Sequence, residues 1–204
     1  MGLKFRLIIV NFLQFFVWGS WMMTLASYGF KEKNWDGAEF GLVFSTMGFA
    51  SLIMPTLFGI IADKWKANYV YAILHLLFGI TMFFLPLIEA PMTFFWVLFV
   101  AMSFYMPTIG LNNSIGFSLL KQEGKDPVTY FPPIRVWGTV GFIIAMWITD
   151  VTNWKSNTNQ FVFASVAMII TGLFSFSMPD VPAENKNTNQ SLSSKFGLDS
   201  FVLF

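Results

Sequence analysis

The sequence contains no cysteine and one histidine, and only 11% of its 204 residues are charged. The lack of cysteine excludes a disulfide scaffold, thiolate metal sites and cysteine nucleophiles. A single histidine excludes a multi-histidine metal centre. Soluble domains carry about 25% charged residues, so this composition argues against a soluble globular domain. The net charge is +1 and no basic stripe could neutralise phosphates, which argues against a nucleic-acid-binding protein.

The composition is instead strongly apolar, with 55% hydrophobic and 19% aromatic residues and a mean hydropathy of +0.62. Six apolar runs are nearly free of charge and have the roughly 20-residue length that crosses a bilayer. They cover residues 7–30, 40–62, 69–88, 92 to about 120, about 128 to 151, and 160–178. The runs are continuously apolar and do not alternate with period two, so they predict helices and not barrel strands. The sequence therefore predicts an all-α membrane protein with a six-transmembrane-helix bundle over residues 1–178.

Basic residues in the short loops predict the orientation of these helices. One side of the predicted bundle carries Lys4, Arg6, Lys64, Lys66, Lys121, Lys125, Lys186 and Lys195, and the other carries Lys31, Lys33 and Lys155. We therefore expect both termini in the cytoplasm. Residues 179–194 are polar, and residues 196–204 become apolar again. We interpret 179–204 as a cytoplasmic linker that leads into a central region and expect the chain to continue beyond it.

Ionisable groups inside a membrane are costly and are therefore candidates for function. All eleven acidic residues lie in loops or at span ends, so only His75 and Arg135 remain. A fifth helix that starts near residue 128 places Arg135 well inside, on one face with Thr139, Phe142 and Met146. A cation, a hydroxyl and a ring suit a polar, ring-shaped solute; the alternative is that Arg135 reaches the cytoplasmic headgroups. His75 is either a proton relay or a neutral packing residue.

Other polar side chains are predicted to line a cavity. On the first span Gln14 and Trp18 share a face, and on the fourth span Tyr105 shares a face with Asn112 and Asn113. The alternative for both spans is hydrogen bonding between helices, with the indole ring in an interfacial aromatic belt.

The second span ends in a short motif that contains Gly59, Asp63 and Lys64. Glycine lets helices approach closely, and the carboxylate of Asp63 could accept hydrogen bonds from another helix end, so we predict a cytoplasmic gate here; the alternative is an ordinary solvated loop. No paired carboxylates, phosphate-binding loop or Ser-His-Asp set are found at a plausible depth, so the sequence does not predict an enzyme.

This motif resembles the loop signature of the major facilitator superfamily. The chain as a whole is similar to one family in it, the bacterial nucleoside:proton symporters. The stretches that carry the resemblance are 12–15 (FLQF), 18–21 (WGSW), 54–55 (MP), 59–65 (GIIADKW), 71–73 (YAI), 105–111 (YMPTIGL), 131–142 (FPPIRVWGTVGF) and 198–201 (LDSF).

The resemblance implies twelve helices in two halves that alternate in access, with this chain as the first half, built from two inverted three-helix repeats. It implies that Arg135, Thr139 and Phe142 line a nucleoside site and that the proton-carrying carboxylates belong to the second half. The implied partners are nucleosides such as uridine and adenosine, protons, the bilayer of the cell inner membrane and the C-terminal half, with no cofactor, metal or nucleic acid. Two alternatives stay open: a sugar:proton symporter of the same superfamily, and a six-helix scaffold or accessory subunit that transports nothing.

Overall fold

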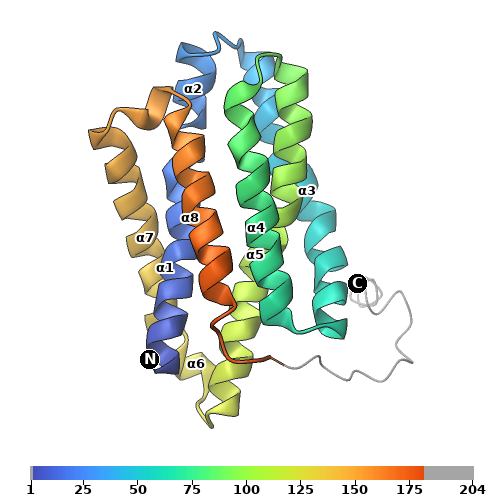
Figure 1. Cartoon of the computed structure of the whole chain (residues 1–204), viewed down its shortest axis with the longest axis vertical. Helices are drawn as coiled ribbons and strands as arrows, with labels where there is room; N and C mark the ends of the chain where they lie inside the picture. The colour runs from blue at the N-terminus through green and yellow to red at the C-terminus, as the bar shows by residue number, and fades with distance from the viewer. Residues whose placement is uncertain (1, 182–204) are drawn as a thin grey trace, which may run out of the picture.

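The computed structural model describes residues 2–181, and this part of the chain contains helices and no strands (Figure 1). The elements are α1 (Leu3–Trp21), α2 (Leu25–Lys31), α3 (Gly37–Lys64), α4 (Ala67–Phe84), η1 (Leu85–Leu87), α5 (Pro91–Gln122), α6 (Pro127–Tyr130), α7 (Pro132–Val151), η2 (Trp154–Ser156) and α8 (Asn159–Ser175). The predicted all-α membrane fold is confirmed. The linker predicted at 179–204 lies outside the described residues beyond position 181.

Five segments are long and apolar enough to cross a membrane: Leu3–Lys31, Gly37–Lys64, Ala67–Leu87, Pro91–Gln122 and Pro127–Val151. The sixth predicted span corresponds to α8, which has 17 residues and ends at Ser175 instead of at 178. Pro179 follows closely, and proline disfavours helical backbone in the residue before it. Two other predicted spans are interrupted. The first breaks between α1 and α2, and the fifth breaks at Phe131, where α6 ends and α7 begins.

The helix boundaries follow from local chemistry. Asp36 and Glu39 form a capping box that satisfies the first N–H groups of α3. Pro91 and Pro132 begin α5 and α7, where their missing N–H groups would have no helical partner. Gly124 follows the end of α5 with a positive φ of 71°, a conformation that glycine adopts without steric cost.

The helices pack in pairs, and the most extensive contacts join α1 to α7, α3 to α5, and α4 to α8. Weaker contacts join α4 to α5 and α1 to α8. Suppose that each of the first three long helices is replaced by its counterpart among the last three: α1 by α5, α3 by α7 and α4 by α8, and the reverse. The pair α1–α7 then becomes α5–α3, α4–α5 becomes α8–α1, and α4–α8 is unchanged, so the same set of pairs results. The pairing is therefore the one expected of two inverted three-helix repeats.

Glycines bring α1 and α7 into backbone contact. A Cβ atom on Gly141 would lie 2.3 Å from the carbonyl oxygen of Phe12, and one on Gly19 would lie 2.3 Å from that of Phe142. Small residues of this kind let membrane helices approach closely, where packing and not a hydrophobic driving force holds them. The contact fixes the position of α7 and hence of Arg135.

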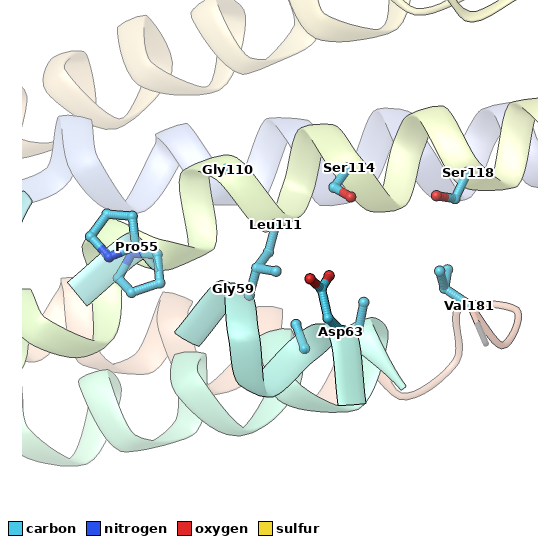
Figure 2. Close-up of a pocket in the computed structure, with 11 residues that line it drawn as sticks. Pro55, Gly59, Asp63, Gly110, Leu111, Ser114, Ser118 and Val181 are labelled. Carbon is cyan, nitrogen blue, oxygen red and sulfur yellow. The ribbon is translucent and has the colours of Figure 1, made fainter. Parts of the chain in front are cut away.

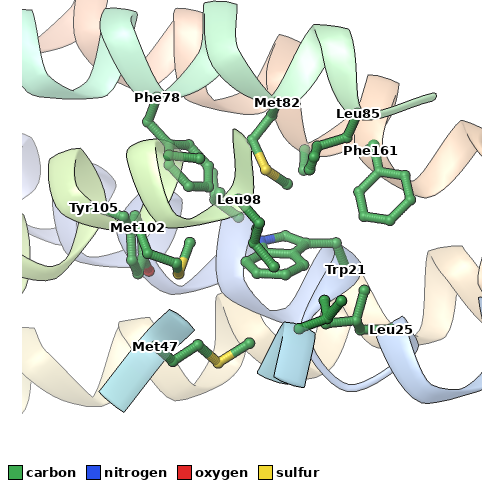
Figure 3. Packing of buried hydrophobic residues seen from close by; sticks show 14 of the residues in the cluster. Trp21, Leu25, Met47, Phe78, Met82, Leu85, Leu98, Met102, Tyr105 and Phe161 are labelled. Carbon is green, nitrogen blue, oxygen red and sulfur yellow. The ribbon is translucent and has the colours of Figure 1, made fainter. Parts of the chain in front are cut away.

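The core between the helices is rich in aromatic rings (Figure 3). The ring of Trp21 on α1 lies 6.4 Å from those of Phe78 on α4 and Phe161 on α8, measured between centroids. By contrast, α3 exposes most of its apolar surface, including Leu52 and Ile53. Exposed apolar surface of this extent suits lipid or another apolar partner in the membrane.

Candidate functional site

Arg135 lies on α7, in the segment Pro127–Val151 that crosses the membrane. It is the ninth residue of this segment, about 12 Å along the axis from its start at 1.5 Å per residue. Its guanidinium carbon lies 3.7 Å from the centroid of the Phe15 ring on α1. Within residues 2–181 the guanidinium makes no hydrogen bond or ion pair, so its N–H groups remain available to a ligand.

A row of aromatic side chains continues from Arg135 into the bundle. The Phe15 ring stacks on Trp18 at 6.4 Å with an interplanar angle of 17°, and Trp18 meets Tyr105 edge-on at 5.3 Å. We call Arg135, Phe15, Trp18 and Tyr105 the arginine stack. Its outer members, Arg135, Phe15 and Trp18, are partly exposed, whereas Tyr105 is buried.

The predicted face of α7 is left uncovered by the other described helices. Thr139 is exposed, and Phe142 and Met146 are partly exposed. The adjacent side of α7, which includes Gly138 and Gly141, is buried against α1. The face that carries Arg135 is therefore open, as a substrate-binding face would be; its assignment to a substrate stays a prediction.

Gln14 lies at the centre of a buried hydrogen-bond network, not on an open surface. Its side-chain N–H donates to the Thr108 hydroxyl at 2.9 Å, and its side-chain oxygen accepts from the Tyr71 hydroxyl at 2.6 Å. Its backbone carbonyl accepts from the Tyr105 hydroxyl at 2.8 Å. These bonds join α1, α4 and α5. In this structure Gln14 and Tyr105 therefore form hydrogen bonds between helices, which was the alternative to lining a cavity.

His75 belongs to the same network and is fully buried. Its Nδ1 lies 2.8 Å from the carbonyl oxygen of Tyr71, one turn earlier on α4. Its Nε2 lies 2.9 Å from the side-chain oxygen of Gln14. One partner on its own helix and one on α1 are what a packing histidine has, and the predicted proton relay stays a prediction.

The two predicted asparagines of α5 differ in their surroundings. Asn112 is buried and donates to the side-chain oxygen of Asn11 at 3.0 Å, which adds a second bridge between α1 and α5. Asn113 is partly buried.

Sequence reasoning missed Phe15, although its spacing of three residues from Trp18 places the two rings on one face.

A pocket of about 230 Å³ lies between α3 and α5 (Figure 2). It lies toward the end of α3, at the end of the bundle where α1 begins (Figure 1). Pro55, Gly59 and Asp63 line it from α3, and Gly110, Ser114 and Ser118 line it from α5. The carboxylate of Asp63 points from α3 toward α5. The structure thus brings Gly59 and Asp63 together, whereas Lys64 is exposed at the end of α3 and does not line the pocket.

Comparison with known proteins identifies the family. A sequence-family match described as "Nucleoside H+ symporter" covers residues 1–204. The chain belongs to this family. It is 44% identical to the xanthosine permease and 43% identical to the nucleoside permease NupG of Escherichia coli K12, over 100% of this chain and 49% of each relative.

The three-dimensional structure is also similar to solved structures of a nucleoside transporter. The crystal structure of an aspartate-to-alanine mutant of nucleoside transporter NupG superposes with a TM-score of 0.95 at 43% identity, over 100% of this chain and 51% of that one. A second crystal structure of NupG gives a TM-score of 0.91. The chain thus has the fold of one half of a major facilitator transporter, is a multi-pass membrane protein, and spans about half the length of the relatives it matches.

Proposed function

We propose that this chain forms the N-terminal half of a transporter that imports nucleosides together with protons and alternates the access of a central site. The observation that carries the proposal is Arg135 on the uncovered face of α7, where its guanidinium stacks on Phe15 of α1. Family membership and the similarity to nucleoside permeases support the substrate class. In this proposal the complete transporter is this chain together with a second six-helix half, which covers the open face.

The chemistry of the open face fits a nucleoside. The planar guanidinium of Arg135 can donate two parallel hydrogen bonds to neighbouring oxygens, such as ribose hydroxyls or a base carbonyl. The Thr139 hydroxyl adds a donor and acceptor one turn away. The ring of Phe142 offers an apolar face on which a base can pack. A site of this kind holds a polar ring without a metal or cofactor.

The proton requires a group that this half does not supply at mid-membrane. Every acidic residue within 2–181 lies at a helix end or in a connection. A proton that crosses with the substrate needs a titrating group near the site, and carboxylates are common carriers in such relays. We therefore assign the coupling carboxylate to the second half.

The distribution of basic residues supports the orientation. The end of the bundle where α1 begins carries Lys4, Arg6, Lys64, Lys66, Lys121 and Lys125, and the other end carries Lys31, Lys33 and Lys155. An excess of lysine and arginine marks the cytoplasmic side. We infer that this end faces the cytoplasm, with the protein in the cell inner membrane. The pocket that Gly59 and Asp63 line would then belong to the cytoplasmic gate.

The test is uptake of radiolabelled uridine and adenosine by the complete transporter, in cells that lack other nucleoside carriers. A protonophore should abolish uptake. Arg135→Ala should lower uptake at least about 10-fold, because hydrogen bonds to charged groups contribute about 1.5–3 kcal/mol each. The matched control is Arg6→Ala, which removes the other arginine of the chain, at the end of the bundle. Uptake that is insensitive to Arg135→Ala would refute the site.

Two alternatives predict other results in the same assay. A sugar:proton symporter would show uridine uptake that sugars inhibit more strongly than adenosine does. A scaffold or accessory subunit would show no solute flux and would co-purify with an unrelated partner at fixed stoichiometry. Membership of the nucleoside H⁺ symporter family favours the nucleoside transporter over both.

A further inference from the structure

We infer that Phe15 and Gly138 are positioning residues that hold the guanidinium of Arg135 in place for the substrate. This inference rests on the proposed function, because it concerns the same site. It assigns a role to two residues that need not touch the substrate. It also predicts that the binding strength of the site depends on an aromatic ring on α1.

The contact between Phe15 and Arg135 is a close cation–π contact. The distance of 3.7 Å from the guanidinium carbon to the ring centroid is van der Waals contact and lies well inside the 6 Å range of this interaction. The described residues provide no carboxylate or carbonyl partner for the guanidinium, so this ring is the main contact that orients it. A ring under one face leaves the N–H groups at the edge free for oxygens of a ligand.

Gly138 makes the room for this contact. It follows Arg135 by one turn on α7, and a Cβ atom there would lie 2.8 Å from Nη1 of Arg135 and 2.6 Å from Cδ2 of Phe15. Both distances are shorter than real Cβ contacts, so any side chain at this position would displace the guanidinium, the ring or both. Glycine at position 138 is thus matched to the stacked position of Arg135.

The ring of Phe15 is itself held by the bundle. Trp18 stacks on it at 6.4 Å, and Trp18 in turn meets Tyr105, whose hydroxyl donates to the carbonyl of Gln14. The stack therefore ends in the buried polar network that joins three helices. An arginine held in this way loses little conformational freedom when a ligand binds, and the ligand gains affinity.

The experiment measures KM and maximal rate of uridine uptake by the complete transporter with Phe15→Leu. We expect KM to rise about 3- to 10-fold, the loss that a cation–π contact implies, with the maximal rate per molecule in the membrane little changed. Phe15→Tyr keeps a ring and should retain a KM close to that of the unchanged protein. The matched control is Phe16→Leu, since Phe16 is also partly buried on α1 but contacts Phe12 and Phe163 instead.

A double-mutant cycle separates positioning from packing. If Phe15 acts through the guanidinium, Phe15→Leu should have little further effect on KM in a protein that already carries Arg135→Lys. The inference is wrong if the two effects multiply, if Phe15→Leu leaves KM unchanged, or if Phe16→Leu raises KM equally. Should Phe15→Leu fail to reach the membrane, Phe15→Met, an unbranched apolar replacement, takes its place in the same cycle. Uptake that is insensitive to Arg135→Ala would instead refute the proposed site itself, whatever Phe15 does.

Discussion

Substituting Gly141 tests the close contact of α1 and α7, on which the position of Arg135 depends. In Gly141→Ala the new Cβ atom would lie 2.3 Å from the carbonyl oxygen of Phe12 and 3.0 Å from its carbonyl carbon. These are backbone atoms and cannot rotate away. Carbon–oxygen contacts in proteins are about 3.3 Å or longer, so the two helices must separate locally by about 1 Å.

This separation should destabilise the protein by about 1–3 kcal/mol, the usual cost of adding a methyl group where a packed structure has no space for it. The contact between α1 and α7 is the most extensive between any two helices of the described chain, so the loss spreads along its length. We expect a lower midpoint of thermal unfolding for the purified complete protein in detergent. Uridine uptake should fall as well, because α7 carries Arg135.

The control is Gly48→Ala on α3. A Cβ atom at Gly48 would meet nothing within 4 Å, so the methyl group has space. Alanine is a better helix former than glycine by roughly 0.5–1 kcal/mol in a helix interior, so Gly48→Ala should leave stability unchanged or raise it. The reasoning is refuted if Gly141→Ala is as stable as the unchanged protein, or if the two alanine variants behave alike.

Two further predictions concern hydrogen bonds. Gln14→Leu should lower the free energy of unfolding by about 1–3 kcal/mol or more, because the buried groups of Tyr71 and His75 lose a partner; an unchanged unfolding midpoint would contradict the network. Outside the membrane-spanning segments, the Thr129 hydroxyl and then backbone N–H groups hold the pKa of Asp126 below its ordinary value of 3.8. The stability that this carboxylate contributes is therefore present above pH 3.8 and is lost as the pH falls through its lowered pKa. Thr129→Val should raise the pKa of Asp126 toward 3.8 in an NMR titration of the carboxyl carbon, and an unmoved pKa would show that the hydroxyl is not the cause.

The spans could be predicted from the sequence because they follow from local chemistry. A chain in hydrocarbon must satisfy its own backbone hydrogen bonds, so long apolar runs become helices wherever they occur. The break inside the first run was missed, since apolar composition continues across it. At the fifth, Pro132 and Pro133 mark the place, and α6 ends just before them at Tyr130.

The side chains of the first span show what sequence could not decide. Helical spacing places Gln14 and Trp18 on one face, but both a cavity and a neighbouring helix suit an amide and an indole ring. The structure packs α4 and α5 against Gln14 and leaves Trp18 partly exposed. The choice depends on which helix lies beside α1, and that is a property of the packed bundle.

The sequence by itself determined the class of the protein, the approximate positions of its membrane helices, and the presence of an arginine, Arg135, within a predicted span. Each of these depends on composition and on neighbours within a few turns. Only the tertiary structure decided that α1 and α7 meet through Gly141, that Gln14 joins three helices, and that Phe15 lies under Arg135. The residues of these pairs are far apart in the chain. Their contacts are close backbone packing, hydrogen bonds and a cation–π contact between helices, which no local pattern of residues encodes.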